Sequence, residues 1–90
     1  EIVIKPGKTE ILSSRERLLS FTISNRGKVP AIRIPLRLEE KVSGVQVLPA
    51  IFSDNYFNLL PGETRALTVR FDSSDEVVVE SVRPDTYRFQ

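Results

Sequence analysis

The fold of this chain is decided by the stretch Phe52-Ser53-Asp54-Asn55-Tyr56-Phe57-Asn58-Leu59-Leu60-Pro61-Gly62-Glu63. It holds the densest cluster of aromatic residues in the sequence. Asp54 and Asn55 break regular strand pairing, because their short side chains hydrogen-bond the nearby backbone. Pro61-Gly62 predicts a type II turn, since proline presets φ at the second turn position and glycine takes the positive φ of the third. We therefore expect one short strand, over residues 56–60, between the two breaks.

Alternation of apolar and polar residues predicts strands on both sides of this stretch. Residues 17–25, 31–39 and 66–71 each repeat with a period of two, which is typical of a strand with one buried face. Pro35 has no N–H to donate, so the strand over 31–39 should lie at a sheet edge or carry a bulge. The side chains expected to point inward are Leu19, Phe21, Ile23, Ile32, Ile34, Leu36, Leu38, Leu67, Val69 and Phe71.

Turn residues divide the rest of the chain into shorter strands. A β-branched run at residues 2–4 should form an edge strand that ends at Pro6-Gly7. Gly27 lies in a turn over residues 25–28 and can take the left-handed conformation. Three further strands are expected, at residues 45–48, at 77–79 extended to Val82, and at 87–89 after a break at Pro84-Asp85.

About seven to eight short strands without a helical period are typical of an all-β, immunoglobulin-like β-sandwich. A small closed barrel is the structural alternative. Ninety residues are enough for one domain with its own core. Because the sequence begins with Glu1 and contains no methionine, we expect residues 1–90 to be a single domain cut from a larger multidomain chain.

Composition excludes several classes of chemistry. The sequence has no cysteine and no histidine, so disulfides, thiolate chemistry and histidine-based catalysis are impossible. Its 13 basic and 12 acidic residues nearly balance, which gives no strong field to attract nucleic acid or an anionic membrane. No apolar run approaches the roughly 20 residues of a membrane span. We therefore expect no nucleic-acid partner and no membrane partner.

Carboxylates do not form a recognisable catalytic pair in the sequence. Glu39 and Glu40 point to opposite faces of a strand. Asp72, Asp75 and Glu76 are close enough in sequence to hold a cation such as calcium, but a solvated turn is the favoured interpretation. The serines have no histidine to activate them and no nucleophile-elbow motif. We expect no catalytic residue, no cofactor and no metal in this chain.

The candidate contact residues are Phe52, Asp54, Asn55 and Tyr56. Their aromatic rings could stack on the apolar C–H face of a sugar, while Asp54 and Asn55 could bind its hydroxyls. Against this interpretation, alternation places Tyr56 and Phe57 on opposite faces, so one of the two belongs to the core. Core packing or contact with another domain is therefore favoured.

The stretch over residues 52–63, Phe-Ser-Asp-Asn-Tyr-Phe-x-Leu-Leu-Pro-Gly-Glu, resembles the C-terminal immunoglobulin-like domain of glycoside hydrolase family 2 enzymes. The branch concerned contains β-mannosidases, exo-β-glucosaminidases and endo-β-mannosidases. A second block resembles the family's Asn-x-Gly-x-x-Ala connection between two early strands, and it reads Ser24-Asn25-Arg26-Gly27-Lys28-Val29-Pro30-Ala31. Together the two blocks cover about residues 18–71.

In that family the catalytic glutamates lie in a separate (β/α)₈ barrel. The resemblance therefore implies a non-catalytic accessory domain that packs against the other domains of a parent glycosidase, and no catalytic residue is carried over. Two alternatives stay open: an autonomous carbohydrate-binding module with an oligosaccharide partner, and an unrelated adhesion or envelope sandwich. The sequence assigns no compartment, although a soluble periplasmic or secreted location would fit a bacterial parent.

Overall fold

The computed structural model describes residues 1–54 and 56–81, which form strands and turns with no helix among them. The strands are β1 (Ile2–Ile11), β2 (Glu16–Asn25), β3 (Ala31–Ile34), β4 (Leu36–Glu40), β5 (Ala50–Phe52), β6 (Phe57–Leu59), β7 (Thr64–Asp72) and β8 (Val77–Ser81). Candidate residue Asn55, the predicted extension to Val82 and the predicted strand at 87–89 lie outside the described residues.

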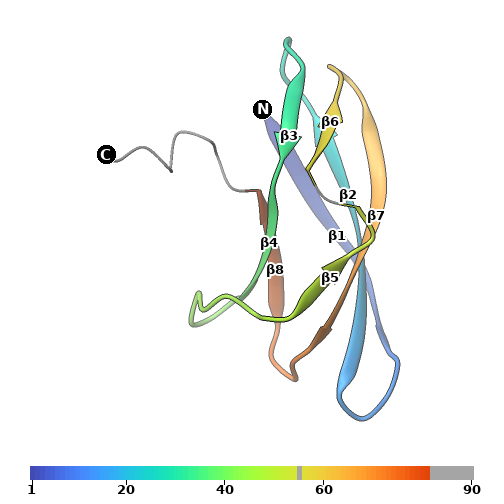
Figure 1. Ribbon diagram of the computed structural model, residues 1–90, viewed down its shortest axis with the longest axis vertical. Helices are drawn as coiled ribbons and strands as arrows, with labels where there is room; N and C mark the ends of the chain where they lie inside the picture. Colours follow the sequence, from blue (N-terminus) through green and yellow to red (C-terminus); the bar gives the residue numbers. More distant parts are fainter. Residues whose placement is uncertain (55, 82–90) are drawn as a thin grey trace.

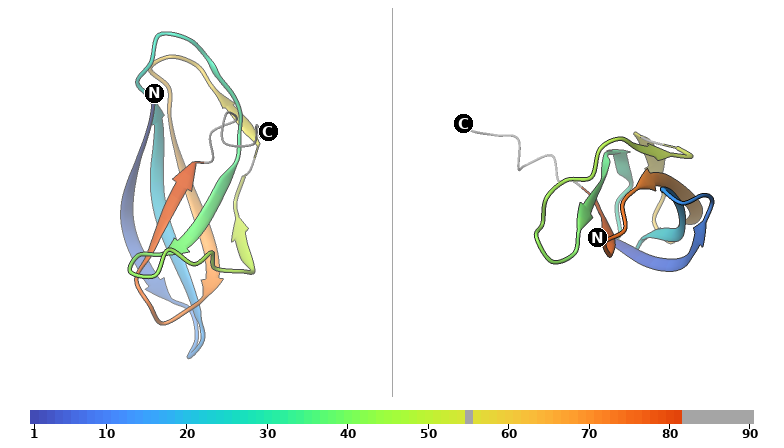
Figure 2. Two further views of the ribbon diagram at one scale, coloured as in Figure 1. Left: turned by 90° about the vertical axis from the view of Figure 1, so that its left-hand side faces the viewer. Right: turned by 90° about the horizontal axis from the view of Figure 1, so that it is seen from below.

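The strands form two facing layers, as Figures 1 and 2 show. One layer is an antiparallel sheet in the order β1-β2-β7-β5. The other consists of two antiparallel ribbons, β3 with β6 and β4 with β8. The four-stranded order matches strands A, B, E and D of the immunoglobulin fold, and the β4–β8 ribbon matches strands C and F. The predicted all-β, immunoglobulin-like sandwich is confirmed, and the sheets of the described residues do not close into a barrel.

The core lies between the two layers and follows the predicted alternation. Every residue expected to point inward is buried, except Ile32. Val47, Phe57 and Leu59 complete the buried apolar set. Burying one such side chain is worth about 1.5–3 kcal/mol, so the alternating strands β2 and β7 supply much of the driving force for folding.

Ile32 was expected in the core, and this prediction is wrong. Its side chain is 64% exposed. The neighbouring Arg33 has a left-handed φ of 52°, and its N–H donates to Asn58 Oδ1 over 2.7 Å. This irregularity shifts the β3–β6 register between Ala31 and Ile34 and interrupts the strict alternation at Ile32. The strand then ends at Pro35, which cannot donate to a ladder.

Two other expected strands differ from the sequence prediction. Strand β1 does lie at a sheet edge, but it does not end at Pro6-Gly7, because its register on β2 shifts there and then resumes at Thr9. Such a bulge accommodates a proline within a strand. Residues 45–48 do not form a strand either, since Gln46 makes only an isolated bridge to Glu39.

Asn25 ties the end of β2 to the opposite layer. Its side chain is 1% exposed, and its Nδ2 donates to the carbonyls of Val29 (2.9 Å) and Leu59 (3.1 Å). Its Oδ1 accepts the N–H of Gly27 at 2.9 Å, and its backbone carbonyl accepts the N–H of Gly62 at 2.8 Å. Both the Nδ2 and the Oδ1 of this buried amide therefore have hydrogen-bond partners. The bond from the Gly27 N–H to Oδ1 links the two residues of the Asn-x-Gly pattern.

Gly27 does not take the left-handed conformation that its turn position suggested. Its importance is steric, because a Cβ built on it would lie 2.6 Å from the backbone nitrogen of Glu1. Arg26 donates its N–H to the Glu1 carbonyl at 2.7 Å, which holds the first residue against this turn. Only a residue without a side chain fits such a close approach.

Candidate functional site

Phe52 lies at the end of the edge strand β5 and packs into the sandwich. Its ring meets that of Phe21 edge to face, with centroids 6.2 Å apart and planes at 88°. Aromatic pairs favour this geometry, because the positive ring edge meets the negative face of its neighbour. The side chain is partly buried against the core, so its ring does not form an open platform.

Asp54 follows β5 in the crossover to β6 and forms an ion pair with Arg65 of β7. Arg65 Nη1 donates to Asp54 Oδ2 over 3.2 Å. Both side chains are partly exposed, so water screens the pair and its contribution to stability is small. The Asp54 carboxylate is thus held by a cation of the same chain.

Arg65 contacts residues near both ends of the stretch 52–63, namely Asp54 and Glu63. Its Nη2 donates to Glu63 Oε2 at 3.3 Å and lies 3.4 Å from the Asn58 carbonyl. Its guanidinium also lies over the Phe57 ring, 4.8 Å from the centroid, a cation–π geometry. We call Asp54, Phe57, Asn58, Glu63 and Arg65 the Arg65 cluster.

Two hydrogen bonds between Leu60 and Glu63 hold the Pro61-Gly62 turn. The N–H of Glu63 donates to the Leu60 carbonyl at 2.9 Å, and Gly62 has a φ of 82°. These features confirm the predicted type II turn. Glu63 Oε1 in turn accepts the N–H of Leu60 at 2.8 Å. This backbone hydrogen bond, helped by Arg65, lowers the pKa of the Glu63 carboxyl below its usual value.

Tyr56 is the candidate residue whose ring faces solvent. It is 65% exposed and has a left-handed φ of 56°. Its N–H donates to the Ile34 carbonyl at 3.1 Å, so the backbone is fixed at the junction with β3. The next residue, Phe57, is buried. The predicted division of these two neighbours between surface and core is therefore confirmed.

The three candidate residues that the structure describes do not converge on one surface. Phe52 packs against Phe21, Asp54 joins the Arg65 cluster, and Tyr56 presents its ring to solvent. Sequence reasoning did not find Arg65, whose partners come from three parts of the chain. A signal for part of the cluster was present, because Glu63 directly precedes β7 and lies two positions before Arg65, the spacing at which side chains of an extended chain share a face.

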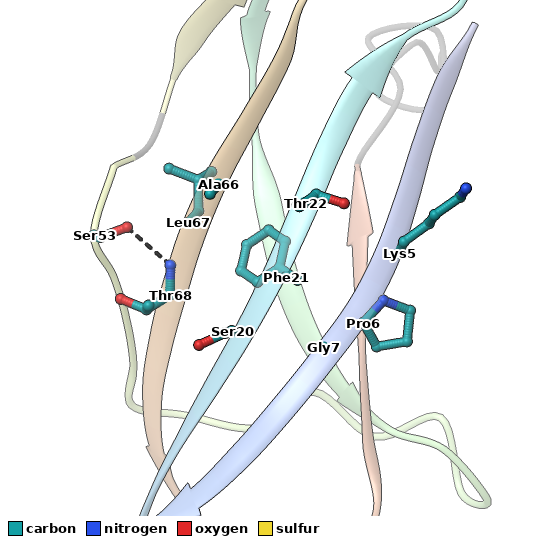
Figure 3. Close-up of a pocket in the computed structure, with 10 residues that line it drawn as sticks. All are labelled: Lys5, Pro6, Gly7, Ser20, Phe21, Thr22, Ser53, Ala66, Leu67 and Thr68. Carbon is teal, nitrogen blue, oxygen red and sulfur yellow. Dashed lines mark hydrogen bonds between the residues drawn. The ribbon is translucent and has the colours of Figure 1, made fainter.

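A shallow hollow of about 500 Å³ lies on the four-stranded sheet beside Ser53 (Figure 3). Ser20 and Thr22 of β2 and Thr68 of β7 contribute hydroxyl groups to it. The Ser53 hydroxyl accepts the Thr68 N–H at 3.0 Å. Among the described residues that line it, Lys5 is the ionisable one and none carries a carboxylate. The hollow therefore lacks the paired acids of glycoside hydrolysis.

Asp72, the last residue of β7, forms an ion pair with Arg15 of the β1–β2 turn. Asp72 Oδ2 lies 3.5 Å from Arg15 Nε. Within residues 1–54 and 56–81, no group of three acidic side chains is arranged to hold a metal ion. The same ranges contain no helix long and apolar enough to cross a membrane.

Comparison with protein-family models shows to which family this β-sandwich belongs. The family model described as the exo-beta-D-glucosaminidase Ig-fold domain matches residues 4–83. The chain belongs to this family. The resemblance to the immunoglobulin-like domain of family 2 glycoside hydrolases is thereby confirmed.

A curated relative of this exo-β-glucosaminidase Ig-fold domain is a mannosylglycoprotein endo-beta-mannosidase from Lilium longiflorum. It is 41% identical over 34 residues, which is 38% of this chain and 4% of the relative. The chain thus matches only a small part of the relative's length. No solved structure matches the chain.

Proposed function

We propose that this Ig-fold domain is a non-catalytic accessory domain of a larger, β-mannosidase-like family 2 glycosidase, in which it packs against the other domains around a separate catalytic barrel. The observation that carries the proposal is a set of large apolar side chains exposed in the β3–β6 ribbon and within two residues of its strand ends. The group consists of Val29, Ile32, Tyr56 and Leu60, each at least 63% exposed, and we call it the ribbon patch.

The pairing of β3 with β6 brings these four residues to one two-stranded ribbon and its ends. Ala31 pairs with Leu59, so Val29 and Leu60 flank the same end of the ribbon. Ile34 pairs with Phe57, which places Tyr56 at the other end. Single exposed apolar residues are common on protein surfaces, whereas grouped ones mark interaction sites. Docking against a neighbouring domain would remove this group from water.

The accessory role also agrees with the chemistry of the described residues. The carboxylates near the candidate site, Asp54 and Glu63, are both held by Arg65. For Glu63, the hydrogen bond from the Leu60 N–H, helped by Arg65, lowers the pKa of the carboxyl, which makes it a poor proton donor at neutral pH. This supports the proposal that catalysis takes place in a separate domain.

Serine substitutions in the ribbon patch test the proposal in the intact parent protein. Tyr56→Ser and Ile32→Ser should leave the unfolding temperature of the isolated 90-residue chain nearly unchanged, because both side chains are exposed in it. In the intact protein the same changes should lower that temperature by about 3 °C or more, since they remove buried apolar contact.

Val42→Ser is the matched control, because Val42 is 95% exposed and lies outside the ribbon patch. It should have no effect in either context. Equal effects of the three substitutions in the intact protein would contradict docking through the ribbon patch. A reading frame without a barrel-sized region would contradict the glycosidase parent itself.

An autonomous carbohydrate-binding module is the second candidate function, and the exposed ring of Tyr56 favours it. Aromatic rings at such sites stack on the apolar faces of sugars. Calorimetric titration of the 90-residue chain with mannan and chitosan oligosaccharides separates the two functions. Binding that disappears in Tyr56→Ala with the fold retained supports the module, whereas no measurable binding supports the accessory domain.

A further inference from the structure

Three basic residues lie beside the ribbon patch without an anionic partner in the described part of the chain. Residues 26–33 read Arg-Gly-Lys-Val-Pro-Ala-Ile-Arg, with three basic residues and no acidic one. Arg26, Lys28 and Arg33 are exposed, and none of them takes part in an ion pair of the described residues. Lys28 and Arg33 are direct sequence neighbours of ribbon-patch residues. We call these three residues the basic rim.

The acidic residues at this end of the molecule do not neutralise the basic rim. Asp54 and Glu63, next to β6, are both held by Arg65, at 3.2 and 3.3 Å. Glu1 accepts the Arg26 N–H through its backbone carbonyl, but its carboxylate forms no ion pair with a described residue. The ribbon therefore offers a partner an apolar surface with a positive border.

The backbone also distinguishes this surface from the rest of the sandwich. Arg33 and Tyr56 are the non-glycine residues with a left-handed φ in the described part of the chain, at 52° and 56°. Such residues are uncommon, and they cluster at binding and active sites, where surrounding contacts hold them. Here the Arg33 N–H donates to Asn58 Oδ1, and the Tyr56 N–H donates to the Ile34 carbonyl. These two hydrogen bonds fix the backbone that carries Arg33 and Tyr56.

We propose that the partner of the ribbon patch is a protein surface with an apolar centre bordered by carboxylates, which form ion pairs with the basic rim. This inference rests on the accessory function proposed above, and it names the chemistry of the domain surface against which the ribbon patch docks. The 34 matched residues are 4% of the endo-beta-mannosidase relative, so a parent of comparable length holds many further residues that can form this surface. Complementary charges would fix the orientation of docking, because like charges across an interface are costly.

The exposed apolar side chains favour a protein partner over a polyanion. The phosphates of a nucleic acid would pair with the basic rim, but they would leave Val29, Ile32 and Leu60, each at least 63% exposed, in water. A protein surface covers both kinds of group, since interfaces combine an apolar core with a polar rim. Tyrosine and arginine, which the ribbon presents side by side with these residues, are also enriched among the side chains that dominate binding energy.

Charge reversal in the intact parent protein tests the inference. Lys28→Glu and Arg33→Glu should each lower the unfolding temperature of the Ig-fold domain by about 3 °C, because the new carboxylate would face the carboxylates of the partner. Within the domain, Lys28→Glu instead removes a like charge from the basic rim, which by itself favours folding. The loss should shrink as salt rises from about 0.05 M to about 0.5 M, because salt screens exposed charges.

Lys8→Glu is the matched control. Lys8 is an exposed cation of β1 without an ion pair among the described residues, and it lies outside the ribbon. Its reversal should leave the unfolding temperature unchanged. Lys28→Glu decides the matter if Arg33→Glu does not fold.

Effects of the rim reversals no larger than that of Lys8→Glu would overturn the inference. If Tyr56→Ser and Ile32→Ser still destabilise the parent in that case, the accessory function stands and the acidic border alone is refuted. If they do not, both proposals are refuted. Binding of the parent to anionic phospholipid vesicles that Lys28→Glu abolishes would also overturn the inference, because the partner would then be a membrane.

Discussion

Replacing Asn25 by alanine should destabilise the sandwich more than any surface change. The substitution removes the hydrogen bond to the buried Leu59 carbonyl and those to Val29 and Gly27, which are partly buried. A buried group left without a partner costs about 1–3 kcal/mol, and an ordinary hydrogen bond contributes about 0.5–1.5 kcal/mol. The expected loss in the free energy of unfolding is therefore about 4 kcal/mol.

This loss is a large part of the stability available to a 90-residue domain, which is about 5–13 kcal/mol at the usual value per residue. Urea unfolding followed by circular dichroism measures it. With an ordinary denaturant dependence, the midpoint of Asn25→Ala should fall by roughly 2 M.

Asn58→Ala is the matched control for Asn25→Ala. Asn58 is exposed, and its Oδ1 accepts one hydrogen bond, from the Arg33 N–H at 2.7 Å. Its replacement should cost less than about 1 kcal/mol. If the two alanine variants unfold at the same urea concentration, the assignment of Asn25 as the link between the layers is refuted.

Three further predictions concern the turns. Gly62→Val should cost at least about 1 kcal/mol through backbone strain, since φ is 82° and nothing lies within 4 Å of an added Cβ; an unchanged urea midpoint would contradict this. Gly27→Ala should lower the free energy of unfolding by about 1–3 kcal/mol through overpacking. The same substitution in a chain that starts at Ile2 should cost less, because the added Cβ clashes with Glu1. Folding lowers the pKa of Glu63 from an ordinary 4.5, so the ionised carboxylate stabilises the fold above pH 4.5, and this stabilisation is lost as pH falls further. The urea midpoint of the native chain should therefore exceed that of Glu63→Gln by less at pH 3 than at pH 6. A difference that is the same at both pH values would contradict this.

Local chemistry made much of this fold predictable. The Pro61-Gly62 turn forms as expected because its two residues restrict φ by themselves. The alternation of β2 and β7 was reliable because each of these strands has one face on the core. A period of two carries that information directly, whatever the rest of the chain does.

The remaining features depend on contacts between distant residues. Ile32 faces solvent because Arg33 takes a left-handed φ that is supported by Asn58, 25 positions later. Arg65 acquires its role from Asp54, which a periodic pattern cannot reveal. Phe52 looked like a possible sugar platform, since nothing local shows that its ring meets Phe21. Its role as a contact residue, like that of Asn55, stays a prediction.

The attachment of Glu1 to the turn at Arg26 and Gly27 has a practical consequence for fusion proteins. The amino terminus lies at the end of the molecule where β3 and β6 meet (Figure 1), close to the ribbon patch. An affinity tag or fluorescent protein joined to Glu1 would therefore stand beside the surface proposed for docking and could block it. Labels for binding experiments belong at the opposite end, on the Ser13-Ser14 hairpin between β1 and β2.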